Sequence, residues 1–76
     1  MSERDVEIGE RVAAAREARG ITQAAIAGLL DVGPTVVSKI ESGTRRLDGF
    51  ELALLAEPLG TTSRALLGLS SRSAAL

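Results

Sequence analysis

The chain contains neither cysteine nor histidine among its 76 residues. The absence of cysteine excludes a disulfide framework, a thiolate metal site and a cysteine nucleophile, and the absence of histidine excludes catalysis by an imidazole base. The sequence also offers no nucleophile paired with a base and no cluster of metal ligands. We therefore expect no cofactor, no metal and no enzymatic activity.

Aromatic residues and long apolar segments are equally scarce. Phe50 is the only aromatic residue, so Ala, Leu, Val and Ile must fill the core, which favours short, closely packed helices over a sheet. No apolar run is long enough to cross a bilayer. The charged N-terminal stretch MSERDVE does not look like a signal peptide. We expect no membrane association and a cytoplasmic location.

The length and the composition of the C-terminus suggest the domain organisation. A chain of 76 residues forms one small domain with a modest core. We expect residues 1–68 to be this domain, with an all-α fold. Residues 69–76, LSSRSAAL, lack apolar periodicity and are rich in Ser and Ala, so we expect a flexible tail there.

Residues 22–43 predict two short helices joined by a tight turn. Thr22 can cap the first helix, because its hydroxyl can accept a hydrogen bond from an amide of the first turn. The inner face of this helix has apolar residues at helical spacing, namely Ile26, Ala27 and Leu30. In the turn, Gly33 is predicted to adopt backbone angles that are closed to other residues.

The second helix of this unit is predicted to begin at Pro34, where the missing amide of proline costs nothing. It should end near Ser42, with Gly43 in the left-handed conformation. Val37 and Ile40 lie on one side of the helix. The opposite side carries hydroxyls and one cation but no carboxylate, in a stripe formed by Thr35, Ser38, Lys39 and Ser42.

Two helices are predicted at the ends of the domain. The first is capped by Ser2 or by Asp5 and runs to about Arg19, and its inner face contains Ile8, Val12 and Ala15. The last is a short helix over residues 63–67, capped by Thr62, with Leu66 and Leu67 supplying its apolar contact.

A further helix is predicted after residue 48. Asp48 and Glu51 have the spacing of a capping box, and Leu47 and Leu52 that of a hydrophobic staple. One side of this helix carries Leu52, Leu55, Ala56 and Leu59, and the other carries Phe50 and Leu54. A helix that is apolar on two sides is usually buried on two sides, so the second side requires another helix or a partner subunit.

Several short motifs occur in an order that resembles the Xre, or lambda-repressor-like, family of helix-turn-helix regulators. They are G-E-R-V (residues 9–12), G-I-T-Q (20–23), I-A-x-L-L (26–30), V-S-K-I-E-S-G (37–43) and E-L-x-x-L-A-x-x-L-G (51–60). The resemblance runs from about Ile8 to Leu67. It implies a compact five-helix domain that binds double-stranded DNA, with the second helix of the motif in the major groove.

The position of the polar stripe in this motif indicates the base-reading residues. We expect Thr35, Ser38 and Lys39 to face the base edges, since lysine can donate to guanine and hydroxyls can donate or accept. Val36 could contact a thymine methyl group, or could belong to the core. Pro34 offers only an apolar surface at a position where the family often carries polar side chains. We therefore expect few base hydrogen bonds and some dependence on DNA shape.

The resemblance also assigns residues that hold the DNA backbone or the fold. Gln23 matches the family's phosphate-contacting glutamine at the start of the first motif helix. Arg16 and Glu41 match an arginine and a glutamate that form a structural ion pair in this family. At the other edge of the motif, the candidate phosphate contacts are Ser42, Thr44, Arg45 and Arg46.

Charge is distributed unevenly along the chain. The net charge is −1, which disfavours DNA binding, because much of the affinity for DNA comes from neutralised phosphates. Residues 32–46, however, include three cations and only one acid. Acidic residues concentrate instead near the start of the chain and in residues 51–57. We expect a basic face on an acidic body, with weak and strongly salt-dependent non-specific binding.

The sequence favours a DNA-binding transcriptional regulator, acting as a repressor and binding as a homodimer. The candidate dimer residues are Phe50, Leu54, Leu66 and Leu69. Two alternatives remain open. One is a protein-interaction module, an antitoxin or adaptor with a protein partner, and the other is the DNA-binding head of a longer regulator. The run DGFELA (residues 48–53) is similar to Xre heads fused to a zinc peptidase domain.

Overall fold

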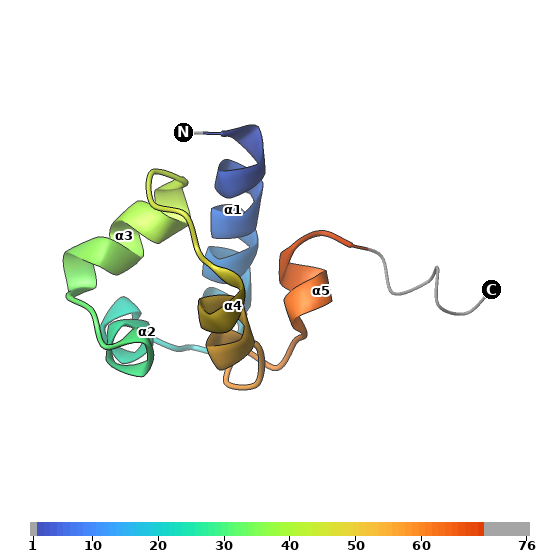
Figure 1. Cartoon of the computed structure of the whole chain (residues 1–76). Helices are drawn as coiled ribbons and strands as arrows, with labels where there is room; N and C mark the ends of the chain where they lie inside the picture. Colours follow the sequence, from blue (N-terminus) through green and yellow to red (C-terminus); the bar gives the residue numbers. More distant parts are fainter. Residues whose placement is uncertain (1, 70–76) are drawn as a thin grey trace.

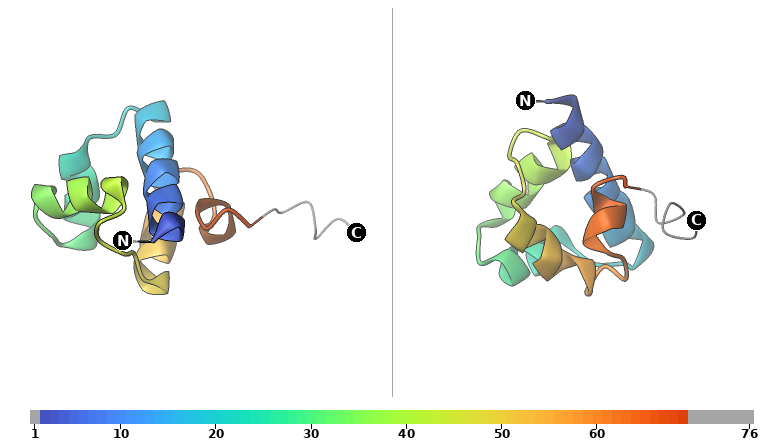
Figure 2. Two further views of the ribbon diagram at one scale, coloured as in Figure 1. Left: turned by 90° about the horizontal axis from the view of Figure 1, so that it is seen from above. Right: turned by 45° about the vertical axis from the view of Figure 1, so that its right-hand side comes forward.

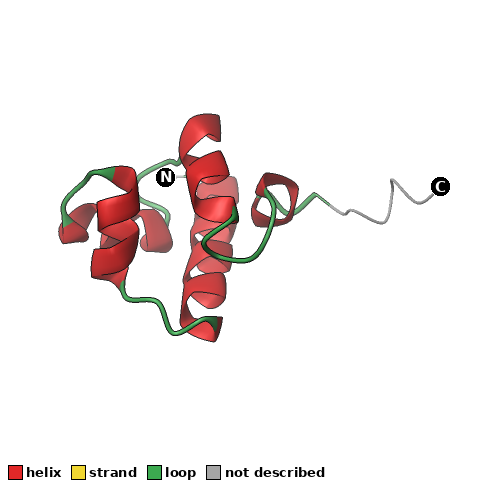
Figure 3. Ribbon diagram, turned by 90° about the horizontal axis from the view of Figure 1, so that it is seen from below, coloured by secondary structure: helices red, strands yellow, loops and turns green. Residues whose placement is uncertain are grey.

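A computed structural model describes residues 2–69. Over this range the chain forms α-helices joined by loops, without a strand (Figures 1 and 3). The helices of this part of the chain are α1 (Glu3–Ala18), α2 (Gln23–Leu30), α3 (Pro34–Ser42), α4 (Gly49–Ala56) and α5 (Ser63–Leu66). The all-α fold with a helix-turn-helix at α2 and α3 is therefore confirmed. Residues 70–76, most of the expected tail, lie outside the described residues.

The two helices of the motif lie on one side of α1, and α5 lies on the other side (Figures 1 and 2). Helix α3 packs against both α1 and α2, and α4 packs against α2 and α5. The exposed surface of α3 consequently faces away from α5. None of the helices of residues 2–69 is long and apolar enough to cross a membrane.

One hydrophobic core joins the helices. The apolar faces predicted from the spacing of Ile8 and Val12 in α1, and of Leu52 and Leu55 in α4, are buried. Leu66 of α5 is only 1% exposed. The complete set of buried apolar residues in the described range is Ile8, Val12, Ile26, Ala27, Val37, Ile40, Leu47, Leu52, Leu55, Leu59 and Leu66. Side chains of medium size thus fill the core, as the scarcity of aromatic residues requires.

The helix caps follow the local sequence. Ser2, and not Asp5, caps α1, and Thr22 and Thr62 cap α2 and α5 through their hydroxyls. Asp48 and Glu51 form the predicted capping box of α4. These side chains satisfy amides that would otherwise be unpaired in the first turn of each helix.

One backbone prediction in the turn of the motif is wrong. Gly33 has ordinary extended angles, with φ −78° and ψ 158°. The left-handed residue is Asp31, with φ 57° and ψ 48°, at the end of α2. Aspartate tolerates this conformation because its short polar side chain can bond locally. The left-handed residue of the turn therefore lies two positions before Gly33, where the sequence had placed it.

Glycine permits a close crossing of α1 and α3. A Cβ atom at Gly9 of α1 would overlap the carbonyl oxygen of Ile40, and would lie 2.8 Å from that of Glu41. At the end of α3, Gly43 has φ 86°, and a Cβ atom there would lie 2.6 Å from the Cα of Val6. Backbone atoms cannot move aside as a flexible side chain can. These two glycines therefore set how closely the second motif helix approaches α1.

The close crossing of α1 and α3 predicts different effects on stability for substitutions at two glycines. Gly9→Ala should lower the free energy of unfolding by about 1–3 kcal/mol or more, because the added methyl group meets backbone. Gly28→Ala, within α2, should raise it by about 0.5–1 kcal/mol, because a helical glycine is conformationally costly and nothing lies within 4 Å of the new Cβ. Thermal unfolding followed by circular dichroism checks both. Equal melting temperatures for the two variants would contradict the close crossing at Gly9.

Candidate nucleic-acid interface

Helix α3 has polar side chains on its exposed face and packs into the core with its opposite, apolar face. Val37 and Ile40 are buried, whereas Thr35, Ser38 and Lys39 are exposed. Within residues 2–69 the Lys39 ammonium group makes no hydrogen bond or ion pair. A lysine that is exposed and unpaired in the free protein retains all its donors for a ligand. The stripe predicted from the sequence is therefore a continuous outer surface of α3.

The start of α3 is apolar. Pro34 is exposed at the first helical position, and Gly33 before it supplies no capping side chain. Val36 is partly buried and packs against the core. The structure thus places Val36 at the border between the core and the outer surface, and it leaves Thr35, Ser38 and Lys39 as the polar side chains of that surface.

A network around the Glu41 carboxylate holds α3 to the rest of the domain. Oε2 of Glu41 accepts a hydrogen bond from Nε of Arg16 at 2.7 Å, and Oε1 accepts one from Nη2 of the same arginine at 3.2 Å. The side chains are 14% exposed for Arg16 and 9% exposed for Glu41. This two-pronged hydrogen bond raises the pKa of Arg16. The structure therefore contains the ion pair that the family resemblance implied.

The same network includes two residues of the candidate interface. Nε2 of Gln23 donates to Oε1 of Glu41 at 2.9 Å, and Oε1 of Gln23 accepts from the Ser38 hydroxyl at 3.2 Å. Arg16 also donates to the backbone carbonyl of Ile21 at 3.0 Å. The sequence places Gln23 at the start of α2 but does not reveal these partners, since the contacting residues are 15 and 18 positions away. Gln23 thus links α2 to the outer surface of α3.

The C-terminal end of α3 is capped by hydroxyls. Ser42 and Thr44 both donate to the carbonyl oxygen of Lys39 at 3.1 Å, and their hydroxyl oxygens lie 3.1 Å apart. Gly43 between them is left-handed, as predicted. Both hydroxyls are at the surface. They fix the turn that leads from α3 into the loop carrying Arg45 and Arg46.

Arg45 and Arg46 each contact a carboxylate. Nη1 of Arg45 donates to Oε1 of Glu51 at 2.9 Å, and this bond lowers the pKa of the glutamate. Nε of Arg46 donates to the Asp5 carboxylate at 3.2 and 3.4 Å. The pKa of Asp5 is lowered by hydrogen bonding to Ser2 and, to a smaller extent, by Arg46. Neither carboxylate was assigned to an arginine from the sequence.

These pairs weaken the basic face expected from the charge distribution. Of the three cations between residues 32 and 46, Arg45 and Arg46 are compensated by acids from α4 and α1. Lys39 remains as the cation without an acidic partner in this region. Over the described residues no group of three or more acidic side chains is placed to hold a metal ion. The interface is therefore a mainly polar surface with a single uncompensated positive charge.

The dimer candidates differ in exposure. Phe50 is 73% exposed and Leu54 40% exposed, both on α4, and Leu69 is also exposed. Leu66 was expected at this surface, and this prediction is wrong, because its side chain lies in the core of the monomer. Of the two leucines expected to supply the apolar contact of α5, Leu66 is buried and Leu67 is 37% exposed. The second apolar side of α4 is therefore not covered by α5.

A helix-turn-helix family model matches residues 12–67. The crystal structure of the restriction-modification controller protein C.AhdI from Aeromonas hydrophila is similar, with a TM-score of 0.71 and 30% sequence identity over 80% of this chain and 92% of that chain. No curated protein matches the chain. The lambda-repressor-like arrangement expected from the sequence motifs is confirmed by both matches.

The Glu41 network leads to a prediction about stability. Glu41→Ala should lower the free energy of unfolding by about 2–4 kcal/mol, because it removes the carboxylate that accepts two hydrogen bonds from the largely buried Arg16 guanidinium. Glu10→Ala, at an exposed position of α1, is the control and should change stability by less than about 0.5 kcal/mol. Thermal melting checks both. Indistinguishable melting curves would show that the ion pair does not hold α3.

Proposed function

The chain belongs to the Xre-type helix-turn-helix family of DNA-binding transcriptional regulators, and we propose that it is a sequence-specific repressor. It binds an operator as a homodimer, with α3 of each subunit in the major groove. Repression follows because the bound dimer occupies the operator. The similarity to a restriction-modification controller protein supports a regulatory role.

The observation that carries the proposal is the outer surface of α3. Its base-facing side chains are Thr35, Ser38 and Lys39, and the buried Val37 and Ile40 on the opposite side make this surface rigid relative to the core. Lysine donates to O6 and N7 of guanine in the major groove, and the hydroxyls serve either hydrogen-bonding role. Pro34 and Val36 supply apolar contacts, for example to thymine methyl groups. The short polar surface implies that DNA shape contributes to selectivity.

Residues at both ends of the motif bind the DNA backbone in this proposal. Gln23 lies at the N-terminus of α2, where unpaired amides and the helix dipole favour a phosphate. Ser42, Thr44, Arg45 and Arg46 act at the opposite edge. The two arginines differ in exposure. The side chain of Arg46 is 75% exposed, whereas that of Arg45 is 35% exposed and bonded to Glu51 of the α4 cap. Arg46 is therefore the stronger candidate for a phosphate contact.

The exposed apolar residues of α4 support a homodimer. Phe50 is the only aromatic residue of the chain, and it lies with Leu54 on the side of α4 that the core does not cover. Burial of such residues between two copies would remove apolar surface from water. A two-fold dimer places its two α3 helices on half-sites about one helical turn, roughly 34–36 Å, apart.

The test is selection of bound sequences from a random duplex pool with the purified chain at moderate salt. We expect a two-fold symmetric site whose half-sites are about one helical turn apart. A site without symmetry would contradict the dimer. Absence of any enrichment by a folded chain would contradict the function itself, and would favour a protein-interaction module that uses the exposed surface of α4.

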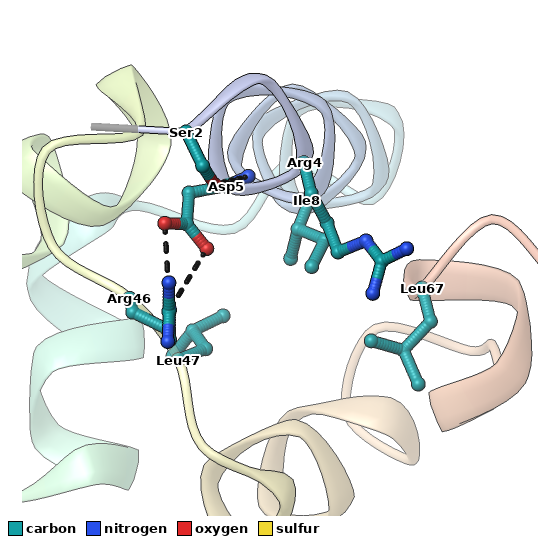
Figure 4. A pocket seen from close by; sticks show the side chains of 7 residues that line it. All are labelled: Ser2, Arg4, Asp5, Ile8, Arg46, Leu47 and Leu67. Atoms are coloured by element: carbon teal, nitrogen blue, oxygen red, sulfur yellow. Dashed lines mark hydrogen bonds and ion pairs between the residues drawn. The ribbon is translucent and has the colours of Figure 1, made fainter.

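Lys39 should determine base preference. Lys39→Ala is expected to relax the preference at one base pair per half-site, at a cost of about 1–3 kcal/mol of discrimination. Arg4→Ala removes the same charge from the side of α1 that faces Leu67 of α5 (Figure 4), and it should leave base preference unchanged. Binding to the selected site and its single-base variants measures both. If Lys39→Ala weakened every sequence equally, the base-reading role would be wrong.

A further inference from the structure

The Asp5–Arg46 pair joins the first turn of α1 to the loop that follows α3. Nε of Arg46 donates to both oxygens of Asp5, at 3.2 and 3.4 Å, across 41 positions of sequence (Figure 4). Arg46 is 75% exposed, whereas the Asp5 side chain is only 11% exposed. The carboxylate is therefore held in place, and the guanidinium extends from it into solvent.

The side chain of Arg46 is not closely packed by its surroundings. The pair borders a hollow of about 280 Å³ between α1, the α3–α4 loop and α5. The hollow is lined by Ser2, Arg4, Asp5, Ile8, Arg46, Leu47 and Leu67. The neighbouring Leu47 is buried and anchors the backbone of the loop. The carboxylate of Asp5, and not close packing, thus determines where the guanidinium of Arg46 lies.

Arg45, the adjacent arginine, is held differently. Its Nη1 donates both to Glu51 and to the backbone carbonyl of Arg46, at 2.9 and 3.3 Å. Since Glu51 also accepts from the amide of Asp48 at 3.1 Å, Arg45 is part of the α4 capping structure. By contrast, the Nη groups of Arg46 make no hydrogen bond within residues 2–69. The outer edge of its guanidinium remains available for an anion.

A carboxylate and a phosphate compete for the same guanidinium. Both are anions that accept hydrogen bonds from its planar fork. Because Asp5 already compensates the charge of Arg46, a phosphate that approaches from a random direction gains little attraction and releases few counterions. A phosphate placed opposite the free Nη groups still gains directional hydrogen bonds. The pair therefore penalises loosely placed phosphates more than correctly placed ones.

We propose that Asp5 is a specificity-determining residue, which acts as an internal stand-in for phosphate on Arg46 and so suppresses binding to non-operator DNA. This inference rests on the proposed function and deepens it. Arg46 then contributes to the operator complex, where the phosphate is correctly placed, and contributes little to non-specific complexes. The net charge of −1 is consistent with a chain that limits its general affinity for nucleic acid.

The test compares two variants that remove one negative charge from the first turn of α1. Asp5→Asn frees Arg46, whereas Glu3→Gln changes an exposed residue of the same turn. Affinity is measured for the selected site and for a scrambled duplex of equal length, over a series of salt concentrations. Asp5→Asn should raise affinity for the scrambled duplex about five- to tenfold at low salt, and steepen the log–log salt dependence by about 0.9, as expected for one more phosphate contact. Glu3→Gln should change the affinity for the scrambled duplex by less than twofold.

Arg46→Gln gives a test that does not depend on Asp5→Asn, in case circular dichroism shows that Asp5→Asn disturbs the helix. Arg46→Gln in the wild-type background should weaken the selected site several-fold and the scrambled duplex by less than twofold. In the Asp5→Asn background it should weaken both. Equal losses on both duplexes in the wild-type background would overturn the inference, because Arg46 would then bind any phosphate.

The outcomes separate the inference from the function on which it rests. If Asp5→Asn and Glu3→Gln raised affinity for the scrambled duplex equally, only net charge would matter and the role of Asp5 would be wrong, whereas the regulator would stand. If the wild-type chain bound selected and scrambled duplexes alike, the proposed function would fail, and the inference with it.

Discussion

The attachment of α3 to α1 through the Glu41 carboxylate is the interaction on which the outer surface depends. Glu41 accepts hydrogen bonds from Arg16 and Gln23, so one carboxylate joins α1, α2 and α3. The glycine crossing at Gly9 brings the helices close enough for these bonds. Packing of Val37 and Ile40 alone would bury the inner face of α3 but would not fix its rotation as firmly, because apolar contacts are not directional.

The loop after α3 also contains arginines that pair with carboxylates. Its two arginines contact acids from other helices, but Arg45 completes a helix cap and Arg46 stays mostly in solvent. Because Arg46 is 75% exposed, its pair with Asp5 contributes little to stability. The pairs also compensate two positive charges at the edge of the motif. In a protein with a net charge of −1, attraction of phosphates depends more on where the cations lie than on how many there are.

The two exposed surfaces of the domain have different characters. The outer surface of α3 is polar and rigidly supported, whereas the uncovered side of α4 is apolar and carries the single aromatic residue. In Figures 1 and 2, α3 lies on the opposite side of α1 from α5. In the proposed function these two surfaces have different partners: the polar surface of α3 binds DNA and the apolar side of α4 contacts a second copy of the chain.

The sequence by itself determined the helices, their caps and their buried faces. Thr22, Pro34 and the Asp48–Glu51 box were identified correctly because a cap involves residues only a few positions apart, and helical periodicity is likewise local. The Arg16–Glu41 contact was expected from family resemblance and not from the local sequence. The partners of Gln23, Arg45 and Arg46, the burial of Leu66 in the core and the left-handed Asp31 became known from the three-dimensional structure. The contacts of Gln23 with Ser38 and Glu41, and of Arg46 with Asp5, span 15, 18 and 41 positions, so they depend on how the helices pack and no local pattern encodes them.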